Sequence, residues 1–174
     1  MHWGTIMRLD LNKCLQRVDE MLRRRIASYS SAANKGAVPA VSRIDLGYQY
    51  DQSGWVSLYL DTRADAGPDG HWTLHIEKNH VDFPEWQAAY EALDEEELTF
   101  ILPGNVERSI PAGISEEEFA AIFGEELKKL LLSAKTSGLF NGLPKTPRCE
   151  LGVSELEGRY GWPEYDDRGR ENLA

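Results

Sequence analysis

Residues 44–60 read Ile-Asp-Leu-Gly-Tyr-Gln-Tyr-Asp-Gln-Ser-Gly-Trp-Val-Ser-Leu-Tyr-Leu, and this stretch decides the fold class. Up to Tyr50, apolar and polar side chains alternate with a period of two, which is the spacing of a strand with one buried face. Residues 51–54 have the composition of a turn, and a second strand pattern follows from Trp55 to Leu60. The stretch therefore predicts a β-hairpin.

Further strand patterns follow the hairpin. After a loop over residues 63–70, residues 72–76 alternate again and predict a third strand in an antiparallel meander. Residues 98–102 are short, β-branched and aromatic, and Pro-Gly closes them, so they predict another strand. Residues 106–110 are a candidate for one more. Together these patterns predict an antiparallel sheet of about four to six strands.

Helical patterns account for most of the remaining chain. Apolar residues recur at steps of three and four over residues 9–30, and again over residues 83–96. A capping box at Ser115 to Glu118 predicts the start of another helix, and Ser137-Gly138 predicts its end. We therefore expect an α+β fold in which the sheet packs against two or three helices, one of them N-terminal.

From Leu139 onward the chain is rich in Gly, Pro and aromatic residues, which predicts an extended, irregular C-terminal segment. The 174 residues contain no repeat and no linker that would divide them. We expect one domain over residues 1–174, with frayed ends at 1–6 and 168–174.

The net charge limits the classes of partner. The chain has a formal charge of -10, divided into +4 over residues 1–36 and -14 over residues 37–174. Such a surface repels phosphate backbones, so we expect no nucleic-acid partner and, instead, a basic protein. We find no signal peptide and no apolar run long enough to span a bilayer, and only two cysteines, which together predict a cytoplasmic protein that is not bound to a membrane.

Few residues suggest catalytic chemistry. On a strand, His71, His75 and Glu77 would share one polar face, but residues four apart lie about 13 Å apart, so a solvated face is favoured over a metal site. Cys14 falls on the apolar stripe of the first helix and predicts a core thiol, while Cys149 lies in a candidate strand. The common phosphate, acyl-transfer and metalloprotease motifs are absent. We predict no cofactor and no catalytic residue, and favour a protein that is not an enzyme.

Candidate binding residues are acidic or aromatic. One group stands at the predicted end of a helix, where carboxylates oppose the helix dipole, and a second group lies in the aromatic tail. The candidates are Asp94, Glu95, Glu96, Glu97, Tyr160, Trp162, Tyr165, Asp166 and Asp167. Each group has a plainer interpretation, as solvated helix ends for the acids and as packing over the sheet for Tyr160 and Trp162.

Three segments carry a family resemblance. Residues 47–50, running into 55–61, and the later Gly161-Trp162-Pro163-Glu164-Tyr165-Asp166 resemble small bacterial immunity proteins of polymorphic-toxin systems. The resemblance implies a cytosolic inhibitor that binds one toxin domain, often a basic nuclease, through a complementary acidic surface.

Three functions remain open at this point. The leading hypothesis is a protein-binding module, of the immunity type, that binds a basic partner. The second is a small enzyme or ligand-binding domain with a pocket between sheet and helices, lined by Tyr48, Tyr50, Trp55 or Tyr59. The third is a structural protein in which an exposed aromatic patch pairs two copies as a homodimer.

Overall fold

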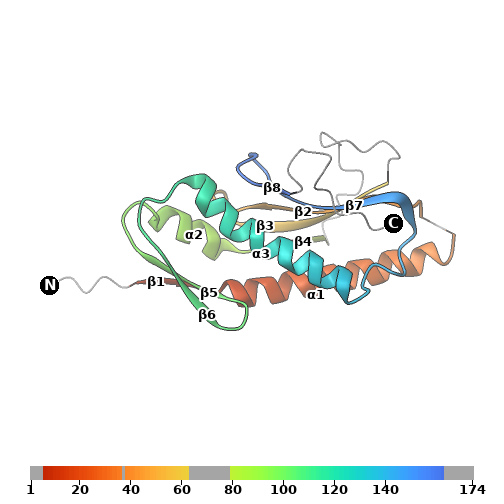
Figure 1. Cartoon of the computed structure of the whole chain (residues 1–174), viewed down its shortest axis with the longest axis horizontal. Helices are drawn as coiled ribbons and strands as arrows, with labels where there is room; N and C mark the ends of the chain where they lie inside the picture. The colour runs from red at the N-terminus through yellow and green to blue at the C-terminus, as the bar shows by residue number, and fades with distance from the viewer. Residues whose placement is uncertain (1–5, 37, 63–78, 163–174) are drawn as a thin grey trace.

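The computed structural model describes residues 6–36, 38–62 and 79–162, which form three helices and eight strands in two sheets (Figure 1). In chain order the elements are β1 Met7–Leu9, α1 Leu11–Ala33, β2 Val41–Gln49, β3 Trp55–Asp61, β4 His80–Asp82, α2 Pro84–Ala92, β5 Leu98–Leu102, β6 Val106–Ile110, α3 Glu116–Thr136, β7 Lys145–Glu155 and β8 Gly161–Trp162. Figure 1 shows the larger sheet along one side of the molecule and α1 along the other, with α3 between them in this view. The α+β class and the N-terminal helix are confirmed.

The predicted hairpin is the centre of the five-stranded sheet, whose order is β4-β3-β2-β7-β8. β2 and β3 pair antiparallel, with Tyr48 opposite Val56. The connecting turn requires glycine at Gly54, where φ is +53° and a Cβ atom would lie 2.2 Å from the carbonyl oxygen of Phe83. The backbone N–H of Phe83 also donates to the Gly54 carbonyl at 2.8 Å. The turn of the hairpin therefore holds the start of α2.

The smaller sheet has the order β1-β5-β6. The strand predicted at 98–102 is β5, and the candidate at 106–110 is β6, its antiparallel partner. Gly104 and Asn105 both have positive φ in the turn between them, a conformation that these two residue types adopt most easily. Both strand predictions are confirmed.

The strands are arranged differently from the single antiparallel sheet that the sequence suggested. There are two sheets, and each contains one parallel pair, β1 with β5 and β2 with β7. A period of two identifies a strand and its buried face but does not identify its neighbour or their relative direction. The third strand predicted at 72–76 lies outside the described residues, and β4 is the strand that pairs with β3.

The C-terminal segment is more regular than predicted. Eleven of its residues form β7, and the register between β2 and β7 shifts between Val41 and Arg43. Pro147 lies in this shifted part of β7, where a missing N–H is tolerated. The Gly and Pro residues of the segment therefore stand mostly in the turns before and after a strand, and the prediction of an irregular course was wrong for β7.

The three predicted helices are present with adjusted ends. Asp10 caps α1 by accepting the N–H of Lys13 at 2.9 Å, and the capping box of α3 is present as predicted. α2 ends at Ala92, four residues before the predicted end, and an exposed turn follows. Within the described part of the chain, no helix combines the length and the apolar character needed to cross a membrane.

The core lies between the helices and the larger sheet and is rich in aromatic rings. Tyr50 stacks on Phe123 with ring centroids 5.8 Å apart, and Phe119 meets both rings edge-on. Cys14 is buried, and Trp86 donates its indole N–H to the sulfur at 3.3 Å, so the predicted core thiol is confirmed. Cys149 is also buried, in β7.

Candidate functional site

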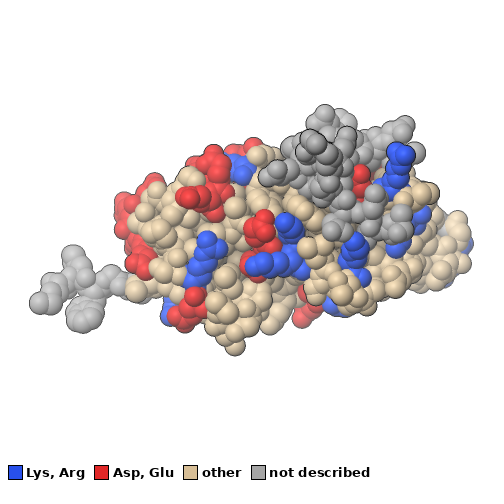
Figure 2. Space-filling model, viewed as in Figure 1, with Lys and Arg blue, Asp and Glu red and all other residues tan. Residues whose placement is uncertain are grey.

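Two acidic segments that lie apart in the sequence meet at one end of the molecule. Asp94, Glu95, Glu96 and Glu97 are all exposed in the turn after α2. The N–H of Gly113, just before α3, donates to the carbonyl of Leu93 at 2.9 Å, which brings the start of α3 beside this turn. Figure 2 shows acidic side chains gathered at the end where α2 and the start of α3 lie. We call residues 94–97 and 116–118 together the acidic end.

The three carboxylates of α3 have different roles. Glu118 accepts the N–H of Ser115 at 3.2 Å and completes the capping box. Glu116 turns toward α2, where the hydroxyl of Tyr90 donates to it at 2.7 Å, and this bond raises the pKa of Tyr90 to about 12. All three also lie in the first turn of a helix, where the helix dipole favours negative charge.

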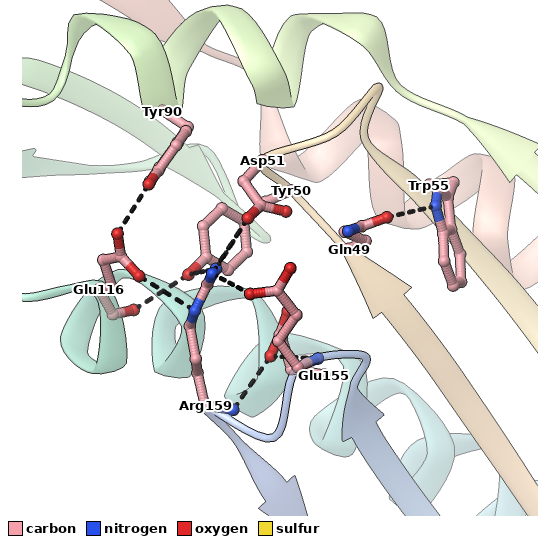
Figure 3. A network of polar contacts seen from close by, with 9 residues as sticks. Gln49, Tyr50, Asp51, Trp55, Tyr90, Glu116, Glu155 and Arg159 are labelled. Atoms are coloured by element: carbon pink, nitrogen blue, oxygen red, sulfur yellow. Dashed lines mark hydrogen bonds and ion pairs between the residues drawn. The ribbon is translucent and has the colours of Figure 1, made fainter.

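Arg159, in the turn between β7 and β8, is the hub of a polar network at this end (Figure 3). It donates to the hydroxyl of Tyr50 at 2.6 Å and to Asp51 Oδ2 from both terminal nitrogens at 3.1 Å. Its Nε lies 3.1 Å from Glu116 Oε2, and it also binds Glu157. Burial lowers the pKa of Arg159, but the bonds to Tyr50 and Asp51 outweigh this effect and raise the pKa overall.

Glu155, the last residue of β7, extends the network inward. Its Oε2 accepts the backbone N–H groups of Glu157 and Arg159 at 2.9 and 3.0 Å. Burial raises the pKa of Glu155 despite these bonds and the nearby guanidinium. Within the described residues, Glu155 Oε1 and Asp51 Oδ1 are buried with no hydrogen-bond partner. We call Arg159 with Asp51, Glu116, Glu155 and Glu157 the Arg159 cluster.

The aromatic candidates of the tail pack against α3. The ring of Tyr160 lies so close to Gly124 that a Cβ atom there would be 2.3 Å from it, and its hydroxyl donates to Glu125 at 2.9 Å. Trp162 is half-buried, with the ammonium of Lys128 5.4 Å from its ring centroid. These contacts favour the packing interpretation of both residues. Tyr165, Asp166 and Asp167 lie outside the described residues.

The aromatic residues proposed to line a pocket lie on opposite faces of the sheet. Tyr48 and Tyr50 are fully buried on the face toward α3, where the Tyr48 hydroxyl donates to the carbonyl of Ala120 at 2.6 Å. Trp55 and Tyr59, one residue out of phase with them in the hairpin register, point the other way. The two tyrosines fill the core, so the pocket that we expected between sheet and helices is not lined by these residues.

Two adjoining hollows border α3. One of about 530 Å³ lies between α3 and β6, and one of about 370 Å³ lies between α3 and α1. Glu126 and Lys129 border both of them, and a salt bridge joins these two side chains. In neither hollow do the described residues include a histidine or a cysteine, so their chemistry is that of a mixed charged and apolar surface.

The predicted metal candidates His71, His75 and Glu77 lie outside the described residues. Elsewhere in the described ranges, no group of three or more His, Cys, Asp or Glu side chains is arranged to hold a metal ion.

Ser57, His80 and Asp82 form a series of hydrogen bonds in the order of a catalytic triad. Ser57 Oγ lies 2.6 Å from Nδ1 of His80, and Nε2 of His80 lies 2.8 Å from Asp82. Such an order can activate a serine as a nucleophile when a substrate reaches its oxygen. Ser57 is only 2% exposed, and it stands opposite His80 in the pairing of β3 and β4. The chain of bonds is therefore best explained as cross-strand stabilisation.

A buried ion pair lies on the face of the larger sheet that points away from α3. Arg43 Nη2 lies 2.9 Å from Asp45 Oδ2, and Ser154 on β7 donates to the same carboxylate at 3.3 Å. Burial raises the pKa of Asp45, and Arg43 opposes that shift. A Cβ atom at Gly152 would lie 2.6 Å from Arg43 Nη2, so glycine makes room for the guanidinium. The hydrogen bond from Ser154 to this pair links β7 to β2 within the sheet.

Sequence reasoning missed the residues at the centre of the Arg159 cluster. Asp51 looked like an ordinary turn residue, and Arg159 is separated from it by 108 positions. Comparisons of the chain with protein families, with curated proteins and with solved structures found no match.

Proposed function

We propose that this protein is a non-enzymatic binding module whose acidic end binds a basic partner protein. The observation that carries the proposal is the hydrogen bond between Gly113 and Leu93, which sets the exposed turn 94–97 beside the first turn of α3. Two acidic segments that would each be a solvated helix end in isolation thus lie beside one another at one end of the molecule. A surface of that kind attracts a partner of opposite charge and disfavours others.

The helix dipole does not explain the negative charge of the turn, in which Glu97 accepts a hydrogen bond from Ser109. The carboxylates of residues 94–97 follow the C-terminal end of α2, where the helix dipole favours cations. They gather beside three more carboxylates of α3, so like charges repel across a short distance. A binding role accounts for this repulsion, because a basic partner relieves it on association.

The resemblance to immunity proteins suggests which kind of partner the acidic end binds. On this proposal the protein is a cytoplasmic inhibitor, and its partner is a basic toxin domain whose functional surface it covers. Charge steering would make association fast at low ionic strength and slower as salt is added, because salt screens exposed charges beyond about 10 Å. The homodimer expected as an alternative stays a prediction, and so does a function in ligand binding.

The test compares how well two variants with the same net charge capture a partner protein. Glu95→Gln/Glu96→Gln removes two charges from the acidic end, and Glu20→Gln/Asp82→Asn removes two exposed charges from α1 and β4. Asparagine at position 82 still accepts a hydrogen bond from His80. Each protein is immobilised, exposed to lysate of the source cell at low salt, and eluted with rising salt.

The proposal expects one basic protein that the native chain and the Glu20/Asp82 variant retain and that the Glu95/Glu96 variant loses. The purified partner must then bind the native chain with an affinity that falls as ionic strength rises. Equal retention by both variants would reject the acidic end as the binding surface.

A further inference from the structure

Each nitrogen of the Arg159 guanidinium already faces a partner. An arginine side chain carries five N–H donors. The two on Nη1 bind Tyr50 and Asp51, the two on Nη2 bind Asp51 and Glu157, and Nε faces Glu116. Any carboxylate oxygen of the Arg159 cluster that is still unpartnered therefore needs a donor from elsewhere.

Such oxygens are present at the base of the cluster. Asp51 Oδ1 and Glu155 Oε1 are buried without a partner in the described part of the chain, and the side chain of Asp51 is only 9% exposed. A buried acceptor without a donor destabilises the fold unless something else offsets it. The unpartnered oxygens mark a part of the described chain where hydrogen-bond donors are missing.

The charges of the cluster do not balance. Three carboxylates contact the one guanidinium, and Glu155 accepts the backbone N–H of Arg159, so negative charge is in excess even when Glu155 carries a proton. The inner charges are buried, where water and salt screen them weakly. A cation held at the cluster would therefore experience more attraction than one held at an exposed carboxylate.

The outer carboxylates of the cluster are within reach of another molecule. The side chains of Glu116 and Glu157 are 49% and 42% exposed, and both contact Arg159, which is 15% exposed. Glu116 also belongs to the acidic end, so the cluster and that surface are continuous. Figure 3 shows Glu116 and Asp51 on different sides of the Arg159 guanidinium, with Tyr90 beyond Glu116.

We propose that the Arg159 cluster anchors the basic partner by accepting one of its arginine or lysine side chains on the exposed sides of Glu116 and Glu157. This inference rests on the proposed function and adds the position and chemistry of its strongest contact. The incoming donors bind the exposed oxygens of Glu116 and Glu157, while Asp51 and Glu155 supply negative charge from below.

The probe is a fluorescently labelled hexa-arginine peptide, with a glycine-serine peptide of equal length as the uncharged reference. Binding is measured by fluorescence anisotropy at low salt. Glu116→Gln/Glu157→Gln should weaken binding roughly tenfold, as expected for a contact with a partly desolvated charge. Glu20→Gln/Asp82→Asn, which removes the same charge elsewhere, should change it less than about twofold.

A second readout locates the peptide independently of any variant. In the native protein labelled with ¹⁵N, the Nε–Hε resonance of Arg159 should shift on addition of hexa-arginine, and that of Arg23 should not. Weakening by Glu95→Gln/Glu96→Gln with no effect of Glu116→Gln/Glu157→Gln would overturn the anchor and leave the acidic end as the binding surface. If neither pair of substitutions exceeded the control, the anchor and the proposed function would fail together.

Discussion

Arg159 binds Asp51 through both terminal nitrogens of its guanidinium, each 3.1 Å from the same carboxylate oxygen. The contact ties the turn after β7 to the turn after β2. Because Glu116 also contacts the guanidinium, the start of α3 joins the same point. The Arg159 cluster is therefore held together by one cation, and the predictions below begin with it.

Replacing Arg159 should destabilise the fold strongly. Arg159→Gln removes the cation from Asp51 and leaves that largely buried carboxylate uncompensated, so we expect a loss of about 2 to 3 kcal/mol in the free energy of unfolding. Arg23→Gln is the control, because Arg23 pairs with Asp19 on an exposed helix face and its loss should hardly change Tm. Urea denaturation at neutral pH measures both. Equal stabilities of the two variants would show that the contacts of Arg159 do not stabilise the fold.

Glu155→Gln should instead stabilise the protein, by about 1 kcal/mol at neutral pH. The amide keeps an oxygen for the two backbone N–H groups and removes a buried negative charge that Asp51 opposes. Since burial raises the pKa of Glu155 in the folded state, the native carboxyl stabilises the fold when protonated and loses that contribution as pH rises through the raised pKa.

The advantage of the Glu155 variant should therefore shrink as the pH is lowered, when the native carboxyl becomes protonated. Urea denaturation of both proteins across mildly acidic to neutral pH measures it. A variant that is less stable than the native protein at every pH would show that the carboxylate is needed in its ionised form.

Gly124→Ala tests whether Tyr160 packs on α3. The new methyl group would lie 2.3 Å from the ring, so Tyr160 must move, and we expect a loss of about 1 to 3 kcal/mol. In a Tyr160→Ala background the same change should stabilise the helix by up to about 1 kcal/mol, because alanine favours helix over glycine. A double-mutant cycle by thermal denaturation separates the two effects. Additive changes would argue for a mobile, surface-exposed Tyr160.

Both thiols should resist alkylation in the folded protein. Burial raises the pKa of Cys14 to about 12 and that of Cys149 to about 11, so very little thiolate is present near neutral pH. Iodoacetamide should label them slowly in buffer and rapidly in denaturant, as followed by mass spectrometry. Because the folded pKa values lie above the ordinary value of 9.0, stability should fall as pH rises from there through these values. Rapid labelling of either thiol in buffer would place it at a reactive site.

Local patterns in the sequence predicted local structure well. The hairpin of β2 and β3, the capping box of α3 and the apolar stripe of α1 each depend on residues a few positions apart, and each is present. The parallel pairing of β2 with β7 joins segments about one hundred residues apart, and no short-range rule specifies it. This is why the strand predictions succeeded and the single antiparallel sheet did not.

The candidate site was predicted in part for the same reason. The acidity of residues 94–97 was visible, because charges opposing a helix dipole stand out locally. The neighbouring start of α3 and the partners of Arg159 were not visible, since they depend on tertiary contacts such as that between Gly113 and Leu93. Tyr160 had two equal interpretations until its contact with Gly124 favoured packing.

The most direct test of the acidic end is the affinity of the captured partner for three proteins, measured by calorimetry at low and at high salt. The native chain and Glu20→Gln/Asp82→Asn should bind alike, and Glu95→Gln/Glu96→Gln should bind several-fold more weakly at low salt. High salt should bring the three affinities together, because it screens exposed charges. Equal binding of all three proteins at low salt, or affinities that salt does not change, would contradict an acidic docking surface.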